Sequence, residues 1–174
     1  MPFPSLGERF ERLEETLQIA QRMFDGDTTP YEGRHFQLAE PVNNPMPVRR
    51  PPIMVGGMGE RRTLRLVAQY ADACNLFEML GPDGLARKLD VLRAHCADVG
   101  RPYDEIVKTT FGMLGDLDLG RAKERFAALA ELGVDLAIVD LPDPADERVF
   151  DFLGALVRET EPLGRAMPAL VAAR

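Results

Sequence analysis

Residues 51–77 constrain the fold more than any other stretch of the chain. Residues 53–55 form a short apolar run without alternation, which is typical of a parallel strand covered on both faces. Glycines follow at positions 56, 57 and 59, then a helical pattern over 60–70 and a second apolar run over 73–77. Strand, glycine turn, helix and strand make a βαβ unit, so we expect a parallel sheet with a right-handed crossover.

The glycine turn has features of an anion-binding site. Gly56, Gly57 and Gly59 let the backbone come close to a ligand, and the N–H groups that open the next helix point toward it. The flanking arginines are Arg49, Arg50, Arg61, Arg62 and Arg65. A tight turn with solvated arginines explains the pattern about equally well, because the full dinucleotide-binding spacing is absent.

The composition limits the class of protein. The 174 residues are 45% hydrophobic and carry a net charge of −7. This apolar content suits one domain, whereas the acidic balance argues against nucleic-acid binding. No apolar run approaches the roughly 20 residues that a membrane span needs. Cys74 and Cys96 are isolated, which argues against a disulfide framework and favours a reducing cytoplasm.

The remaining sequence predicts helices and strands in alternation. Ser5 followed by Glu8 indicates a capping box, and apolar residues at intervals of three and four predict a helix to about Phe24. A small hairpin is expected over 31–38, followed by prolines that hold the chain extended. The expected strands of the parallel sheet are 53–56, 73–77, 106–112 and 134–139, with a helix after each.

Two α/β architectures fit a leading helix and four βα units: an open doubly wound sheet, or half of a (β/α)8 TIM barrel. Closed barrels need about 250 residues, and this chain has too few strands to close one. An open sheet normally begins with a strand, whereas this chain begins with a helix. We therefore predict a single partial TIM-barrel domain over 1–174. Its expected parts are a leading helix (1–26), a hairpin and proline-rich excursion (27–52), four βα units (53–162) and a tail (163–174).

Several stretches carry a family resemblance. The longest reads VGGMGERRTLRLVA over 55–68 and YADACNLF over 70–77, and others cover 2–5 with 7–15, 33–36 and 131–135. Together they resemble the luciferase-like monooxygenase superfamily, and within it the deazaflavin (coenzyme F420)-dependent oxidoreductases. Family members are full barrels of roughly twice this length. The resemblance therefore implies the C-terminal half of the barrel, without the first four strands and their contacts to the flavin ring and substrate.

The resemblance implies roles for individual residues. Gly56, Gly57, Met58 and Gly59 match the family turn that wraps the cofactor phosphate through backbone contacts. Asn75 matches the carboxyl end of the next strand, which faces the same mouth of the barrel. Phe77 matches the same strand end. Ordinary side-chain packing at the mouth of the barrel explains the positions of Asn75 and Phe77 about equally well. The implied cofactor is coenzyme F420, with FMN as the alternative, and the implied reaction is hydride transfer to a small organic substrate.

The sequence offers no convincing catalytic acid or base. Asp72 and Glu78 are candidates by location alone. His35 is expected to be an ordinary surface histidine, and His95 has no second ligand at metal-binding spacing.

Two other functions remain open for such a chain. One is an FMN-dependent monooxygenase half-barrel. The other is a catalytically incomplete half-barrel whose main property is association. Its two open sheet edges would then pair with a second copy to give a homodimer.

Overall fold

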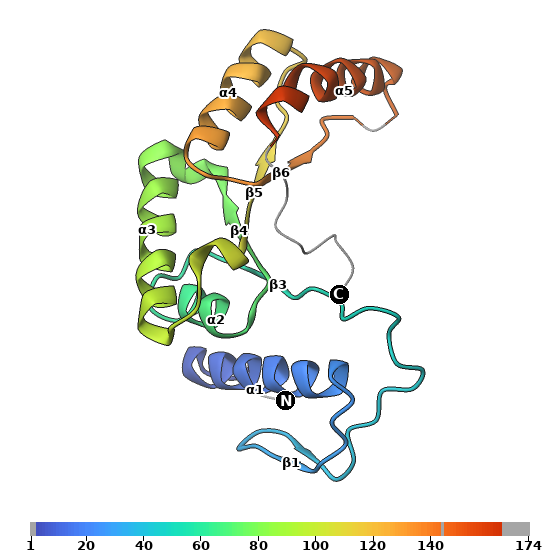
Figure 1. Cartoon of the computed structure of the whole chain (residues 1–174). Coiled ribbons are helices and arrows are strands. Elements are labelled where there is room, and N and C mark those ends of the chain that lie inside the picture. The colour runs from blue at the N-terminus through green and yellow to red at the C-terminus, as the bar shows by residue number, and fades with distance from the viewer. Residues whose placement is uncertain (1–2, 144, 165–174) are drawn as a thin grey trace. The chain divides into compact units, whose positions relative to one another are not determined.

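The computed structural model describes residues 3–143 and 145–164, so residues 165–174 of the predicted tail lie outside the described residues. The described chain divides into two compact units, one within residues 3–53 and one within 54–164. Figure 1 traces their elements in chain order. That both units belong to one domain stays a prediction.

The first unit is built on helix α1, Leu6–Phe24. Ser5 caps it as the sequence predicts, because its Oγ accepts a hydrogen bond from the Glu8 N–H at 3.2 Å. The reciprocal half of the capping box differs, since the Glu8 carboxylate pairs at 2.7 Å with Arg12, one turn further along. After the helix the chain turns through Gly26, whose φ of 73° is costly for residues other than glycine.

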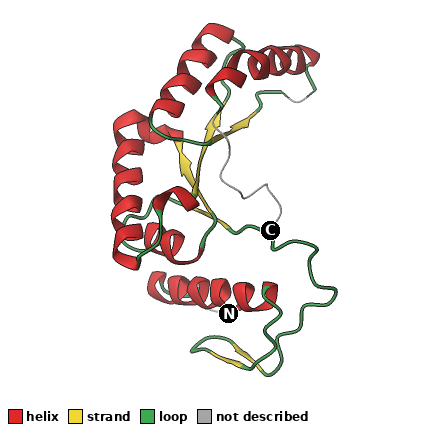
Figure 2. Cartoon of the chain, viewed as in Figure 1, coloured by secondary structure: helices red, strands yellow, loops and turns green. Residues whose placement is uncertain are grey.

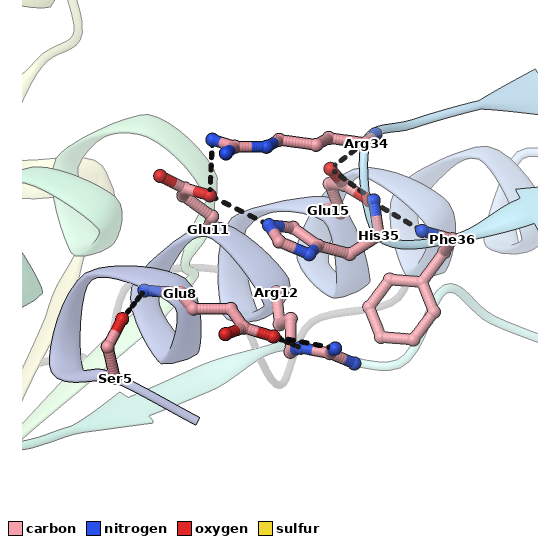
Figure 3. Close-up of polar contacts among 8 residues, drawn as sticks. All are labelled: Ser5, Glu8, Glu11, Arg12, Glu15, Arg34, His35 and Phe36. Atoms are coloured by element: carbon pink, nitrogen blue, oxygen red, sulfur yellow. Dashed lines mark hydrogen bonds and ion pairs between the residues drawn. The ribbon is translucent and has the colours of Figure 1, made fainter. Parts of the chain in front are cut away.

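The predicted hairpin forms, with strand β1, Tyr31–Glu32, antiparallel to β2, Gln37–Leu38. Its tip lies on α1, where the Glu15 carboxylate accepts hydrogen bonds from three successive backbone N–H groups (Figure 3). The donors are Arg34 at 2.8 Å, His35 at 3.0 Å and Phe36 at 2.9 Å. A Cβ atom at Gly33 would collide with this carboxylate, so a larger residue there would displace it.

Side chains of the hairpin tip add ionic contacts to α1. His35 Nε2 lies 2.7 Å from Glu11 Oε2, and Arg34 Nη1 lies 3.0 Å from the same oxygen. Only 11% of the His35 side chain is exposed, so this histidine is tied to α1 and is not the ordinary surface residue that the sequence predicts. Burial alone would raise the pKa of Glu15, but the backbone donors at His35, Phe36 and Arg34 outweigh it and lower that pKa.

Replacing Glu15 with Ala is expected to release the hairpin tip, because three backbone N–H groups lose their shared acceptor. Hydrogen exchange at Arg34, His35 and Phe36 should then become roughly tenfold faster or more. The control is Glu40→Ala, since Glu40 is exposed and has no ion pair among the described residues. Unchanged exchange at these three amides in Glu15→Ala would show that the carboxylate does not hold the tip.

The second unit contains a parallel sheet with the strand order β3-β4-β5-β6 (Figure 2). Its strands are Met54–Gly56, Ala73–Phe77, Val107–Met113 and Leu136–Asp140. Each predicted strand is confirmed, with small shifts at the ends. The order follows the chain without the reversal that a doubly wound sheet has, so the open-sheet alternative is wrong.

Helices connect and follow the strands of this sheet. They are α2, Thr63–Tyr70, α3, Gly81–Val99, α4, Leu119–Glu131, and α5, Glu147–Thr160. With right-handed crossovers, a sheet whose order follows the chain carries all its helices on one face, as the wall of a (β/α)8 barrel does. Figure 2 shows these helices along one side of the strands. Helix α2 begins later than residue 60, because the chain first makes a wide turn closed by Leu64 N–H and Gly59 C=O at 3.0 Å.

The helix-facing side of the sheet holds the core of this unit. Val55, Cys74 and Leu76 are buried there. The buried residues of α2 and α3 include Leu64, Val67, Leu85, Leu89, Leu92 and Cys96. A second cluster joins α4 to α5 and consists of Leu114, Ala122, Phe152 and Leu156. Both cysteines are buried free thiols, and burial raises the pKa of Cys74 to about 11.

The opposite side of the sheet carries several exposed apolar side chains, and we call it the open face. Strand register places Met54, Phe77, Met113 and Leu136 on this side, where they are 47%, 38%, 73% and 42% exposed. Parallel sheets are normally covered on both faces, and a complete barrel encloses this side in its interior. The open face therefore corresponds to the inner wall of a barrel.

Candidate functional site

The glycine turn follows strand β3 at its carboxyl end and leads into α2. Gly56 is in register with Asn75 of β4, and the Gly57 N–H donates to the Asn75 carbonyl oxygen at 3.1 Å. This hydrogen bond continues the parallel ladder past the end of β3. The predicted residues Gly56 to Gly59 and Asn75 therefore lie side by side at the carboxyl end of β3.

Thr63 explains why the turn needs glycine at two of its three glycine positions. A Cβ atom at Gly59 would lie 2.7 Å from Thr63 Oγ1, and one at Gly57 would lie 3.2 Å from Thr63 Cγ2. Gly57 also has a φ of 132°, which other residues rarely adopt. At Gly56 the nearest atom would be 3.9 Å away, so that glycine is not required by packing. Sequence reasoning weighed a ligand against a tight turn for all three glycines and missed the buried threonine beneath them.

The turn leaves backbone donors without partners. Gly57 uses its N–H on Asn75, whereas the N–H groups of Met58 and Gly59 have no acceptor among residues 3–143 and 145–164. Both groups lie just before the amino end of α2, where the helix dipole favours a negative charge. Two adjacent N–H donors, on a stretch of backbone that a ligand can approach closely, suit a phosphate oxygen.

The charges near the turn are positive. Arg61 and Arg65 are exposed, and neither forms an ion pair within the described part of the chain. The first turn of α2 carries no acidic residue. The other predicted pair, Arg49 and Arg50, precedes the amino end of β3 and belongs to the first unit.

Glu60 fixes the turn to helix α3. Its carboxylate accepts a hydrogen bond from Lys88 Nζ at 2.6 Å and from Arg87 Nε at 3.0 Å, while its carbonyl oxygen lies 2.7 Å from His95 Nε2. The hydrogen bonds from Lys88 and then Arg87 lower the pKa of Glu60. Because the carbonyl accepts, His95 carries a proton on Nε2. The one sequence signal for these contacts is that Lys88 and His95 are seven residues apart and therefore share one face of α3.

The catalytic candidates Asp72 and Glu78 lie at the two ends of β4. Asp72 is at the opposite, amino end of β4, where its carbonyl accepts from the Val107 N–H at 2.9 Å. The Glu78 carboxylate accepts from Thr110 Oγ1 at 3.0 Å and from Arg125 Nε at 2.7 Å. Glu78 thus ties the end of β4 to β5 and α4.

Phe77 lies on the open face, as the match to the barrel mouth implied. Its ring packs edge-on against Phe111, with the centroids 6.1 Å apart. Asn75 lies on the same face, one strand away from the glycine turn. Its side-chain oxygen lies 3.0 Å from Thr109 Oγ1.

Within the described ranges, no group of three or more His, Cys, Asp and Glu side chains is placed to hold a metal ion. No helix there is both long and apolar enough to cross a membrane.

Comparison with known proteins supports the sequence resemblance. The family model described as luciferase-like monooxygenase matches residues 4–136. A curated relative, the F420-dependent glucose-6-phosphate dehydrogenase of Microbacterium testaceum (strain StLB037), is 27% identical over 134 residues. That match covers 74% of this chain and 39% of the relative.

Two solved structures are similar in fold. An F420-dependent secondary alcohol dehydrogenase with an F420–acetone adduct has a TM-score of 0.73 at 14% identity, over 95% of this chain and 64% of the other. A riboflavin lyase with modified FMN and riboflavin has a TM-score of 0.59 at 14% identity, over 76% of this chain and 34% of the other. The chain therefore spans less than two thirds of these relatives. The predicted fold, part of a (β/α)8 barrel, is confirmed.

Replacing Glu60 with Gln is expected to lower the free energy of unfolding at neutral pH, because the ion pairs with Lys88 and Arg87 are lost. The lowered pKa of Glu60 gives the pH dependence. The ionised Glu60 carboxylate contributes to the free energy of unfolding at pH values above 4.5, its pKa in the unfolded chain. This contribution is lost as the pH falls through the lower pKa that Glu60 has in the folded chain. Urea midpoints of the wild type and Glu60→Gln should therefore differ most at neutral pH and converge in acid.

The matched control is Glu124→Gln, because Glu124 is exposed on α4 and has no ion pair among the described residues. Its urea midpoint should follow that of the wild type at every pH. A Glu60→Gln deficit that persisted unchanged in acid would contradict an ionic link between the turn and α3.

Proposed function

The chain belongs to the luciferase-like monooxygenase family, and from this premise we propose that it supplies the cofactor-phosphate-binding part of an F420-dependent oxidoreductase. The proposed reaction is hydride transfer between the deazaflavin and a small organic substrate. One observation carries the proposal: the N–H groups of Met58 and Gly59 lie without acceptors on the carboxyl rim, beside Asn75. In barrels of this kind the active site lies at that rim.

The residues present fit the phosphate end of such a cofactor. Gly57 and Gly59 keep the backbone free of side chains, the Met58 and Gly59 N–H groups would donate to a phosphate oxygen, and Arg61 would add positive potential. The bound deazaflavin would supply two-electron hydride chemistry, while the protein positions it. We assign no acid or base to this chain, because Asp72 lies at the opposite end of β4 and the Glu78 carboxylate pairs with Arg125.

The choice of F420 over FMN rests on the relatives. The curated relative and the solved structure with a TM-score of 0.73 are both named as F420-dependent. The riboflavin lyase, whose structure holds a modified FMN, keeps a monooxygenase or other flavin-dependent function as the alternative. Because the chain spans 39% to 64% of these F420-dependent proteins, we also propose that other barrel strands complete the ring and substrate sites.

Titration with coenzyme F420, and separately with FMN, tests this proposal. We expect F420 to bind the wild-type chain and Gly57→Ala to weaken binding about tenfold or more, which is roughly 1.4 kcal/mol. The added methyl would press against Thr63 in a turn with a φ of 132°. Isothermal titration calorimetry measures both affinities directly.

Gly100→Ala is the matched control. Gly100 also has a positive φ, 71°, but it ends α3 and an added Cβ meets nothing within 4 Å. This change should cost about 1 kcal/mol of stability and leave the cofactor affinity unchanged. If neither cofactor bound the wild type even at millimolar concentration, the isolated chain would have no cofactor function.

A second candidate function is association without catalysis, and the open face favours it. Strands β3 and β6 are the two edges of the sheet, and the exposed residues Met54, Met113 and Leu136 lie on the face that a barrel would enclose. We propose that two copies pair β6 with β3 reciprocally, which keeps all strands parallel and gives eight of them in a ring.

Sedimentation velocity at tens of micromolar tests this association. We expect a dimer for the wild type and a shift toward monomer for Leu136→Lys, which places a charge on the buried face of the dimer. The control is Val157→Lys, on the outer surface of α5, where Val157 is also exposed. A wild-type chain that sediments as a monomer at this concentration rules the dimer out.

A further inference from the structure

We propose that Thr109 is a positioning residue. It turns the side-chain amide of Asn75 so that the oxygen, and not the nitrogen, faces the ligand side of the sheet. Asn75 then presents a hydrogen-bond acceptor to an N–H or O–H group of the bound molecule. The assignment of a ligand rests on the proposed function, whereas the orientation of the amide rests on Thr109 alone.

The geometry around Thr109 carries the proposal. Thr109 is in register with Asn75 on the neighbouring strand and is only 1% exposed. Its Oγ1 lies 2.8 Å from the carbonyl oxygen of Cys74 and 3.0 Å from the side-chain oxygen position of Asn75. The hydroxyl therefore faces two acceptor oxygens at hydrogen-bonding distance.

A threonine hydroxyl has one proton, so it cannot donate to both oxygens. Whichever oxygen takes the proton, the other forms an oxygen–oxygen contact of about 3 Å with no hydrogen between, which is repulsive in a buried position. The two ends of a side-chain amide have nearly the same shape and are assigned from their hydrogen bonds. Rotating the Asn75 amide by half a turn removes the conflict. Thr109 then donates to Cys74 and accepts from Asn75 Nδ2.

This orientation decides what Asn75 can recognise. Its nitrogen is turned toward Thr109, to which one of its two N–H groups donates. Its oxygen is therefore the atom turned toward a ligand, and an oxygen only accepts. The adjacent glycine turn offers the opposite, two N–H donors at Met58 and Gly59. The pair fits one molecule that carries an anionic group and, one strand further along the rim, a hydroxyl or an N–H. A phosphorylated polyol chain attached to a flavin-like ring has both.

Hydrogen exchange of the Asn75 side-chain amide, measured by NMR on the full chain without ligand, tests the orientation. With the nitrogen bonded to buried Thr109, exchange should be about tenfold slower than for Asn44, which is exposed. Thr109→Val removes the acceptor and should bring the Asn75 rate close to that of Asn44. Thr109→Ser keeps the hydroxyl and should restore slow exchange. Asn75 protons that exchange in the wild type as fast as those of Asn44 would overturn the proposal.

Cofactor titration separates this proposal from the proposed function. If the wild type binds F420 or FMN, Thr109→Val should weaken binding several-fold while Thr109→Ser binds like the wild type. Equal affinity of all three proteins would overturn the positioning role even if the amide orientation holds. If the wild type binds neither cofactor, the proposed function fails, and the exchange rates still decide the orientation. The exchange rate of the Asn75 side-chain amide in the wild type is enough to decide its orientation. The orientation therefore stays testable even if Thr109→Val folds poorly.

Discussion

The parallel pairing of β3 with β4 is the constraint on which the candidate site depends. Without the hydrogen bond from Gly57 N–H to the Asn75 carbonyl, the position of the turn relative to β4 would not be fixed. That bond aligns the glycine backbone with β4, and Thr63 closes the turn from below. Glu60 then holds the far end of the turn to α3 through Lys88 and His95. The unused N–H groups of the turn are thus held in place from three directions.

Local sequence pattern was sufficient to predict most of the secondary structure. The strands and helices here follow the periodicity of apolar residues, and glycines mark their ends. The apolar run at 73–77 became β4 with the same ends, and Gly100 ends α3 in the left-handed conformation. The start of α2 was less predictable, since no capping side chain marks it. The choice between a barrel wall and a doubly wound sheet needed the strand order, which no local pattern contains.

The site could be predicted only in part. A glycine run before a helix identifies a backbone turn, and the next strand end follows from topology, so Gly56 to Gly59 and Asn75 could be named together. Contacts between distant side chains leave no such pattern. The Glu60 carboxylate binds partners more than 25 residues away in the sequence. Thr109 of β5 contacts Asn75 of the neighbouring strand β4. Glu78 looked available from its position in the sequence, but its ion pair with Arg125 is visible only in three dimensions.

The packing of Thr63 under Gly57 and Gly59 also restricts the order in which this segment could change during evolution. The γ-methyl of Thr63 crowds position 57, whereas its hydroxyl crowds position 59. A methyl group could be accepted at position 59 only after Thr63 had been exchanged for a smaller residue. The reverse order would pass through an intermediate with colliding atoms. Position 57 would stay closed on either route, since its φ of 132° excludes most side chains whatever residue lies beneath it.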